Sequence, residues 1–137
     1  AKVTLGGFRQ VKSHVIWRFQ LAGDGLALKD HVPGHDRRTY PVIPETDLRG
    51  RWHRIEVHAR WSRGADGFLR VWADGEKKVD FSGRSMTAEA VYFKYGVYRS
   101  ALSRYKEARG VREVPAQTAY FANVRRAATR DGLEPPP

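Results

Sequence analysis

Apolar and polar side chains alternate along several short stretches of the chain, which is the pattern of half-buried β-strands. The clearest stretch runs from residue 14 to 21 and separates an apolar face from a mainly polar one. The apolar face comprises Val15, Trp17, Phe19 and Leu21. The polar face comprises His14, Ile16, Arg18 and Gln20. We therefore expect a strand that buries one face and presents the other to solvent or to a ligand.

The same alternation predicts further strands, separated by glycine-containing turns. They are expected at Trp52–Trp61, Phe68–Trp72, Lys77–Phe81, Val91–Arg99 and Thr118–Arg125. The segment from residue 33 to 44 contains three prolines and is predicted to be a long surface loop, because proline interrupts a ladder. Residues 100–112, rich in Arg, Lys, Ala and Leu, are predicted to form a loop with one helical turn.

Many short strands without intervening long helices predict an all-β fold, an antiparallel two-sheet β-sandwich. A length of 137 residues suits one domain, expected over residues 1–130. The last residues, 131–137, end in three prolines and are predicted to be a disordered tail. No apolar run approaches the roughly 18 residues that cross a bilayer, so we expect no membrane partner.

The composition is strongly basic, with 25 Lys and Arg against 15 Asp and Glu and a formal net charge of +10. Such a surface attracts polyanions, although an excess charge also serves solubility alone. No Cys is present, which excludes thiolate metal sites and cysteine nucleophiles. His31 and His35 are four residues apart in a Pro-Gly segment rather than on a helix, so we expect no metal and no cofactor.

Two segments resemble known families, the first a fold shared by enzymes and binding modules and the second polysaccharide lyases. The residues Trp52-His-Arg-Ile-Glu-Val-His-Ala-Arg-Trp61, with the hairpin that ends at Asp74-Gly75, are similar to the concanavalin-like jelly rolls. The strand Val91-Tyr-Phe-Lys-Tyr-Gly-Val-Tyr-Arg99 resembles the Tyr-Phe-Lys-x-Gly-x-Tyr strand of alginate lyases and the Lys-x-Gly-x-Tyr of heparin-lyase-like enzymes. The resemblance implies a jelly-roll fold, of which this chain would be all or the C-terminal part.

The resemblance also implies candidate site residues. Tyr98 and Lys94 would be catalytic, sharing one strand face with Gly96 between them. The substrate-binding candidates are Arg18, Gln20, His14 and Arg99. Where alginate lyases carry Gln-x-His on a central strand, this chain has Arg18 and Gln20, and the Arg-x-Glu-x-Arg strand of those enzymes is absent.

These residue types suit β-elimination from a uronic acid. Cations and amides stabilise the charge that develops on the carboxylate, and tyrosine can transfer the proton where nearby cations lower its pKa. We therefore expect a polysaccharide lyase acting on an acidic polysaccharide, in a secreted or periplasmic location. The alternative is a non-catalytic binding module for acidic glycans on the same sandwich. A nucleic-acid binder is less well supported, since no helix-turn-helix, RNP or KH pattern occurs, and we expect no specific nucleic-acid partner.

Overall fold

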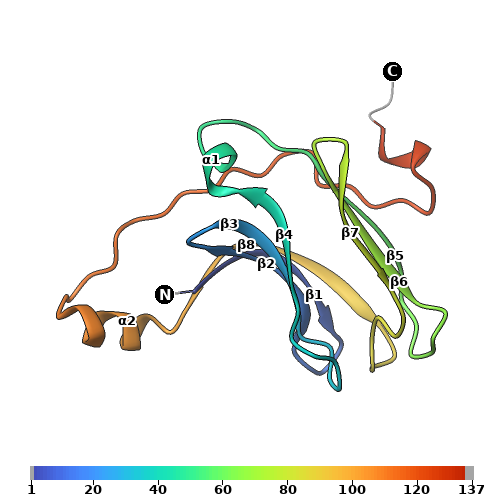
Figure 1. Ribbon diagram of the computed structural model, residues 1–137, viewed down its shortest axis with the longest axis horizontal. Coiled ribbons are helices and arrows are strands. Elements are labelled where there is room, and N and C mark those ends of the chain that lie inside the picture. The colour runs from blue at the N-terminus through green and yellow to red at the C-terminus, as the bar shows by residue number, and fades with distance from the viewer. Residues whose placement is uncertain (1, 135–137) are drawn as a thin grey trace.

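The computed structural model describes residues 2–134 and contains two antiparallel sheets (Figure 1). The strands are β1 (Lys2–Gln10), β2 (Val15–Ala22), β3 (Gly25–Asp30), β4 (Thr39–Pro44), β5 (Ile55–Arg60), β6 (Phe68–Ala73), β7 (Glu76–Ser82) and β8 (Val91–Ser100). The helices are α1 (Glu45–Leu48), α2 (Leu102–Arg109) and the 3-10 helix η1 (Asp131–Leu133). None of the described helices is long and apolar enough to cross a membrane.

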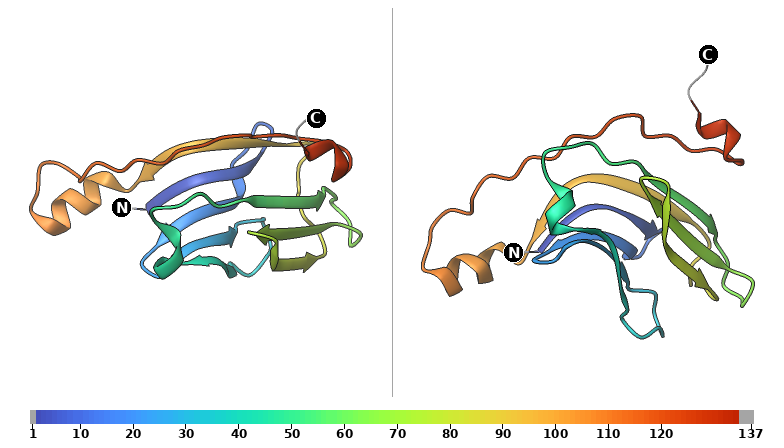
Figure 2. Two further views of the ribbon diagram at one scale, coloured as in Figure 1. Left: turned by 90° about the horizontal axis from the view of Figure 1, so that it is seen from above. Right: turned by 45° about the horizontal axis from the view of Figure 1, so that its top comes forward.

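The larger sheet has the order β4-β3-β2-β1-β8 and the smaller sheet the order β5-β6-β7. The larger sheet is curved, and the smaller one lies on its convex side (Figures 1 and 2). The predicted antiparallel two-sheet sandwich is therefore confirmed. β1 and β3 were not predicted as strands, because the glycines of β1 and the short run of β3 give weak alternation.

The core lies between the two sheets and is built from the alternate apolar positions of their strands. Trp17 of β2 and Leu28 of β3 are fully buried, as are Leu69 and Val71 of β6. The Trp17 indole packs against Phe81 of β7, with 5.2 Å between ring centroids. Apolar faces of β2 and β6 thus hold the sheets together.

Two of the predicted segment boundaries are wrong for identifiable reasons. The predicted loop at residues 33–44 contains strand β4, which pairs only with β3. An edge strand tolerates proline, because its outward N–H groups need no ladder partner. β5 begins three residues later than expected, since His53 is held outside the ladder by hydrogen bonds to Asp74 and to the Leu48 carbonyl, at 2.7 and 3.0 Å.

The predicted strand Thr118–Arg125 is also wrong, since this segment forms no strand. Asn123 has a φ of 54°, a left-handed conformation that is incompatible with a continuous strand. Aromatic side chains connect the segment to the rest of the domain. Tyr120 approaches Trp52, and Phe121 approaches Tyr95, with centroid distances of 6.5 and 5.2 Å.

The C-terminal third contains more helix than the sequence predicts. The predicted loop at residues 100–112 contains the eight-residue helix α2. Part of the predicted tail forms η1, and Glu134 pairs with Arg54 at 2.9 Å. Residues 135–137 lie outside the described residues, so the disorder of the tail stays a prediction.

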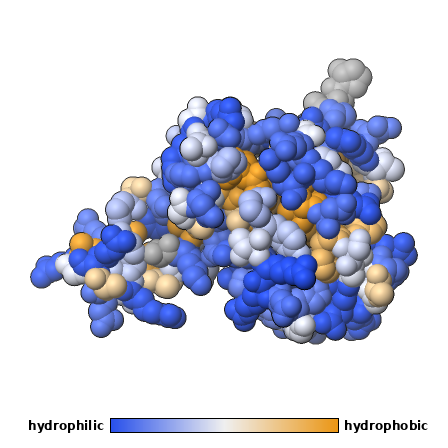
Figure 3. All heavy atoms as spheres, viewed as in Figure 1, coloured by the Kyte–Doolittle hydropathy of each residue, from blue (hydrophilic) through white to orange (hydrophobic). Residues whose placement is uncertain are grey.

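An apolar hollow opens at the edge where β4 approaches β7. Figure 3 shows a band of apolar surface there, surrounded by hydrophilic side chains. The hollow has a volume of about 320 Å³ and is lined by residues that include Leu26, Val42, Ile43 and Lys78. It contains none of the six predicted site residues.

Irregular pairing bends the larger sheet near β8. Across the sheet, Gly7 of β1 pairs with Arg18 and Lys94, and Thr4 pairs with Gln20 and Tyr98. Between these two sets of paired residues, β2 advances by two residues and β8 by four. The extra residues in β1 and β8 form bulges, which bend a sheet and strengthen its twist. Gly96 lies in the β8 bulge with a φ of 137°. The bulge therefore requires a residue without a side chain.

Gly96→Ala should destabilise the protein by about 1–3 kcal/mol, the cost of holding a non-glycine residue in such a conformation. An added Cβ would meet no atom within 4 Å, so backbone strain alone would act. Gly23→Ala is the matched control, because Gly23 is equally open but does not have a positive φ. Urea unfolding of both variants measures the difference, and equal stability of the two would contradict the strain at Gly96.

Candidate functional site

The predicted site residues fall into two rows that cross the larger sheet. In the first row, Gly7 of β1 pairs with Lys94 of β8 and Arg18 of β2, and Arg18 pairs with Lys29 of β3. Directly paired residues project from the same face of a sheet. The cations of three strands thus share one face, with a glycine between Arg18 and Lys94.

The second row runs parallel to the first. Thr4 of β1 pairs with Tyr98 of β8 and with Gln20 of β2. Adjacent strands lie about 4.8 Å apart, and β1 lies between β2 and β8, so the backbones at Tyr98 and Gln20 are about 10 Å apart across the sheet. Tyr98 is 65% exposed, whereas Gln20 is only 6% exposed. Tyr98 is therefore open to a ligand, and Gln20 presents little surface to one.

Both rows lie on the face opposite to the core. Trp17 and Phe19, which alternate with Arg18 and Gln20 along β2, are buried between the sheets. The rows consequently occupy the concave side of the larger sheet, which turns away from β5, β6 and β7 (Figure 2). A curved open face of this kind suits an extended chain better than a small enclosed ligand.

The cations of this face have no acidic partners. Among the described residues, no ion pair involves Arg18, Lys29 or Lys94. The Arg18 Nε is buried and has no hydrogen-bond acceptor. A buried donor without a partner is costly unless water or a ligand supplies an acceptor. The face is therefore positively charged and has a free guanidinium donor, which suits a carboxylate.

His31 belongs to this face, although the sequence did not single it out for a role there. Its backbone N–H donates to the Ile16 carbonyl at 2.7 Å, which continues the β2–β3 register two residues beyond Lys29. His31 therefore lies on the same face as Lys29 and Arg18. The sequence pattern indicated only a possible metal-binding pair of His31 and His35. Its even spacing from Lys29 would have been informative, had β3 been predicted as a strand.

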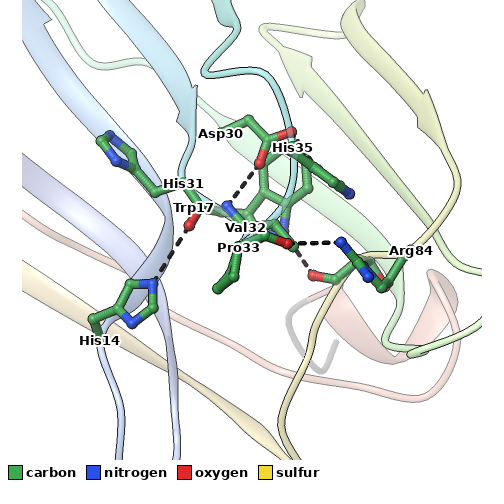
Figure 4. A network of polar contacts seen from close by, with 9 residues as sticks. His14, Trp17, Asp30, His31, Val32, Pro33, His35 and Arg84 are labelled. Atoms are coloured by element: carbon green, nitrogen blue, oxygen red, sulfur yellow. Dashed lines mark hydrogen bonds and ion pairs between the residues drawn. The ribbon is translucent and has the colours of Figure 1, made fainter.

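A polar network fixes the loop that follows β3 (Figure 4). Asp30, only 2% exposed, accepts hydrogen bonds from the Val32 N–H and from His35 Nδ1, at 2.9 and 2.8 Å. Arg84 donates to the Pro33 carbonyl at 2.7 Å. The network ties the loop down on the side of His35, while His31 lies on the other side of it, beside His14 (Figure 4).

The pKa of His31 is lowered below its ordinary value of 6.5, first by burial and then by the positive charges of Arg18 and Arg37. The unfolded chain therefore binds more protons than the folded one just below pH 6.5. The titration of His31 therefore lowers the free energy of unfolding as the pH falls from 6.5 towards the pKa of His31 in the folded protein. The lowered pKa keeps His31 neutral at pH 7.

Arg18→Gln should raise the pKa of His31, because it removes one of the nearby positive charges. Nuclear magnetic resonance titration of the His31 ring measures the change directly. Arg63→Gln, which removes a charge in the turn before β6, should leave this pKa unaltered. An unchanged His31 pKa in the Arg18 variant would show that the two side chains are not electrostatic neighbours.

The remaining candidates lie at the margins of the face. His14 precedes β2, and its Nε2 lies 3.4 Å from the His31 carbonyl oxygen. Arg99 pairs in register with Val3, a buried core residue, and so projects from the other face of the sheet. Its guanidinium donates to the Pro115 carbonyl at 2.6 Å. The structure thus brings together Lys94, Tyr98, Arg18 and Gln20, with His14 nearby, and separates Arg99 from them.

No group of three or more metal-binding side chains occurs in the part of the chain that the structure describes. His53 and His35 are each bonded to a single carboxylate, of Asp74 and Asp30 respectively. The absence of a metal stays a prediction.

Comparison with known proteins supplies the family. No curated protein and no solved structure matches the chain significantly. The family model described as polysaccharide lyase matches residues 9–125, a range that includes β2, the turn carrying His31 and the whole of β8. Since this match spans most of the chain, the protein belongs to the polysaccharide lyase family.

Proposed function

We propose that this polysaccharide lyase cleaves a uronic-acid-containing polysaccharide by β-elimination on the concave face of its larger sheet. In this reaction a base removes the proton on C5, and the resulting negative charge is delocalised onto the carboxyl group. A double bond then forms between C4 and C5 as the bond from C4 to its glycosidic oxygen breaks, and an acid protonates that oxygen. No water is consumed.

The observation that carries the proposal is the row of unpaired cations around Gly7. The buried, partnerless Arg18 Nε and the Lys94 ammonium lie on opposite sides of a position that has no side chain. A uronate carboxylate held between the two cations would accept hydrogen bonds from Arg18 and receive the charge of Lys94. Such contacts stabilise the negative charge that grows on the carboxylate as C5 loses its proton.

Tyr98 is the proton-transfer group of this proposal. Its exposed phenolic oxygen belongs to the neighbouring row. As the phenolate it accepts the C5 proton, and the hydroxyl formed in this way then gives that proton to the departing oxygen. A single group serves both steps if proton and leaving oxygen lie on one side of the sugar ring. General acid and base groups act within about 2.6–3.2 Å of the atoms they serve.

His31 has a supporting role in the proposal. A neutral imidazole donates a hydrogen bond to a carboxylate or hydroxyl without adding to the desolvation cost of a second buried charge. Its lowered pKa favours this neutral form. It occupies the side of the face towards β3, so it would contact a sugar next to the one that reacts.

The substrate class also suggests where the protein acts. An acidic polysaccharide is the partner that fits the unpaired cations, and such polymers are encountered outside the cytoplasm. We therefore propose a secreted or periplasmic enzyme, without a specific nucleic-acid or membrane partner.

Incubation with alginate, glucuronan and a heparin-like polymer tests the proposal, with dextran as the neutral control. We expect ultraviolet absorbance from unsaturated ends with at least one acidic polymer and none with dextran. Absence of product from all three would contradict the proposed reaction.

A non-catalytic binding module for acidic glycans is the second candidate. The burial of Gln20 favours it, since a residue only 6% exposed adds little to a catalytic site. Binding to an acidic polymer without any product would support this alternative.

A further inference from the structure

Helix α2 protrudes from the sandwich without packing on it. None of its residues is buried, and it makes no substantial contact with another helix or strand. Figures 1 and 2 show it extending beyond the end of β8, and Figure 3 shows a mainly hydrophilic surface around it. Residues 101–112, which contain α2, are called the basic arm below.

The basic arm concentrates positive charge. It carries Arg104, Lys106, Arg109 and Arg112, and Glu107 as its one acidic residue. No ion pair involves these four cations among the residues the structure describes. Lys106 and Arg109 are three residues apart on the helix, a spacing at which like charges repel.

α2 has little internal support beyond its Gly110 C-cap and the basic residues of its last turn. Helices shorter than about 12–15 residues are marginal in water unless tertiary packing supports them. The eight residues of α2 have no such packing. A polyanion lying along the arm would neutralise the repulsion and supply the missing contacts.

The arm continues the candidate substrate face. It begins at Ala101, directly after β8 and three residues beyond Tyr98. A helix of eight residues is about 12 Å long, so it extends the cationic surface by that length. Arg109 lies over the Tyr105 ring, with 5.4 Å from the guanidinium carbon to the ring centroid. This contact orients a planar donor group that matches carboxylates.

We propose that the basic arm is an outer subsite that binds the acidic polysaccharide beyond the sugars at the reacting centre. The proposal rests on the proposed function for its choice of ligand. Because only a long polymer reaches both the concave face and the arm, the arm increases affinity for long chains. It leaves the handling of short oligosaccharides unaffected.

Substitution of Arg104, Arg109 and Arg112 by Ala tests the arm against a control with the same loss of charge. The control variant replaces Arg49, Arg63 and Lys77, which are exposed residues elsewhere in the chain. Equilibrium binding of long glucuronan is measured at two salt concentrations. We expect the arm variant to bind at least about 10-fold more weakly with a smaller salt dependence, and the control to stay within about 2-fold.

Two further measurements separate the arm from the reacting centre. Circular dichroism of the wild type should show added helix upon glucuronan binding, and the arm variant should not. Turnover of short uronate oligosaccharides should be the same in both proteins. A wild type that binds glucuronan through the arm without forming product would overturn the proposed function while supporting the arm.

Three results would overturn the inference. Equal loss of affinity in the arm and control variants would show that only net charge matters. Unaltered glucuronan binding in the arm variant would show that the arm is not a subsite. Tighter, arm-dependent binding of duplex DNA or of phosphatidylserine vesicles than of glucuronan would assign the arm to another polyanion.

Discussion

Tyr98→Phe should lower turnover of the acidic polysaccharide by about 10²–10⁴-fold, the usual contribution of a general acid or base. The substitution removes only a hydroxyl from a side chain that is 65% exposed, so the fold should not change. Binding should be retained, since the cations of the neighbouring row remain. Initial rates of product formation and equilibrium binding of the same polymer measure the two effects separately.

Tyr95→Phe is the matched control for this prediction. Tyr95 belongs to the same strand and is 55% exposed, but it pairs with Gly6 and projects from the other face of the sheet. Its loss of a hydroxyl should therefore leave the rate unaltered. A Tyr98→Phe enzyme with the wild-type rate would remove Tyr98 from the mechanism.

Trp17→Ala should destabilise the protein by about 3–5 kcal/mol, the usual cost of removing a large buried aromatic side chain. Trp17 is fully buried, packs on Phe81 and donates from Nε1 to the Ser85 carbonyl at 2.9 Å. The variant loses this packing and leaves an unpaired buried carbonyl. Since the free energy of unfolding of a domain is only about 5–15 kcal/mol, the substitution should remove a large part of it.

The control for Trp17 is Trp52→Ala. Trp52 is 67% exposed and its ring lies 6.5 Å from that of Tyr120, so its removal should change stability by no more than about 0.5 kcal/mol. Thermal and urea unfolding of both variants compare the two positions. Similar losses would mean that Trp17 does not hold the sheets together as the structure indicates.

The two-sheet sandwich was predictable because alternation with period two survives wherever one face of a strand is buried. β2, β6, β7 and β8 follow this rule, and their positions were predicted to within a few residues. Segment 118–125 shows its limit. Its alternation resembles that of a strand, but ladder formation depends on backbone conformation, and the left-handed Asn123 interrupts it.

The shared face of Lys94 and Tyr98 was predicted from simple alternation, although β8 is not a regular strand. The stretch of β8 from Lys94 to Tyr98 contains two residues more than the matching stretch of β2. Because side chains alternate between the two faces, an even number of extra residues leaves Tyr98 on the same face as Lys94. A single extra residue would have turned Tyr98 to the other side. The glycine at position 96 hinted at a bulge, but the sequence alone does not show how many residues it contains.

Lys29 and His31 could not be assigned to the face from the sequence, because β3 was not recognised. The run Gly25–Asp30 contains Leu26, Ala27 and Leu28 in succession, without alternation, and all three are buried. A strand buried on both faces lacks the polar positions that mark alternation. The register of the sheet, which depends on long-range pairing, was needed to place these two residues.

The masses of the cleavage products test the central claim most directly. A uronate oligosaccharide of defined length is digested and its fragments are weighed by mass spectrometry. β-Elimination predicts that the masses of the two fragments add up to the mass of the parent, because no water enters the products. Fragments that together exceed the parent by one water molecule would indicate hydrolysis and would contradict a lyase mechanism on this face.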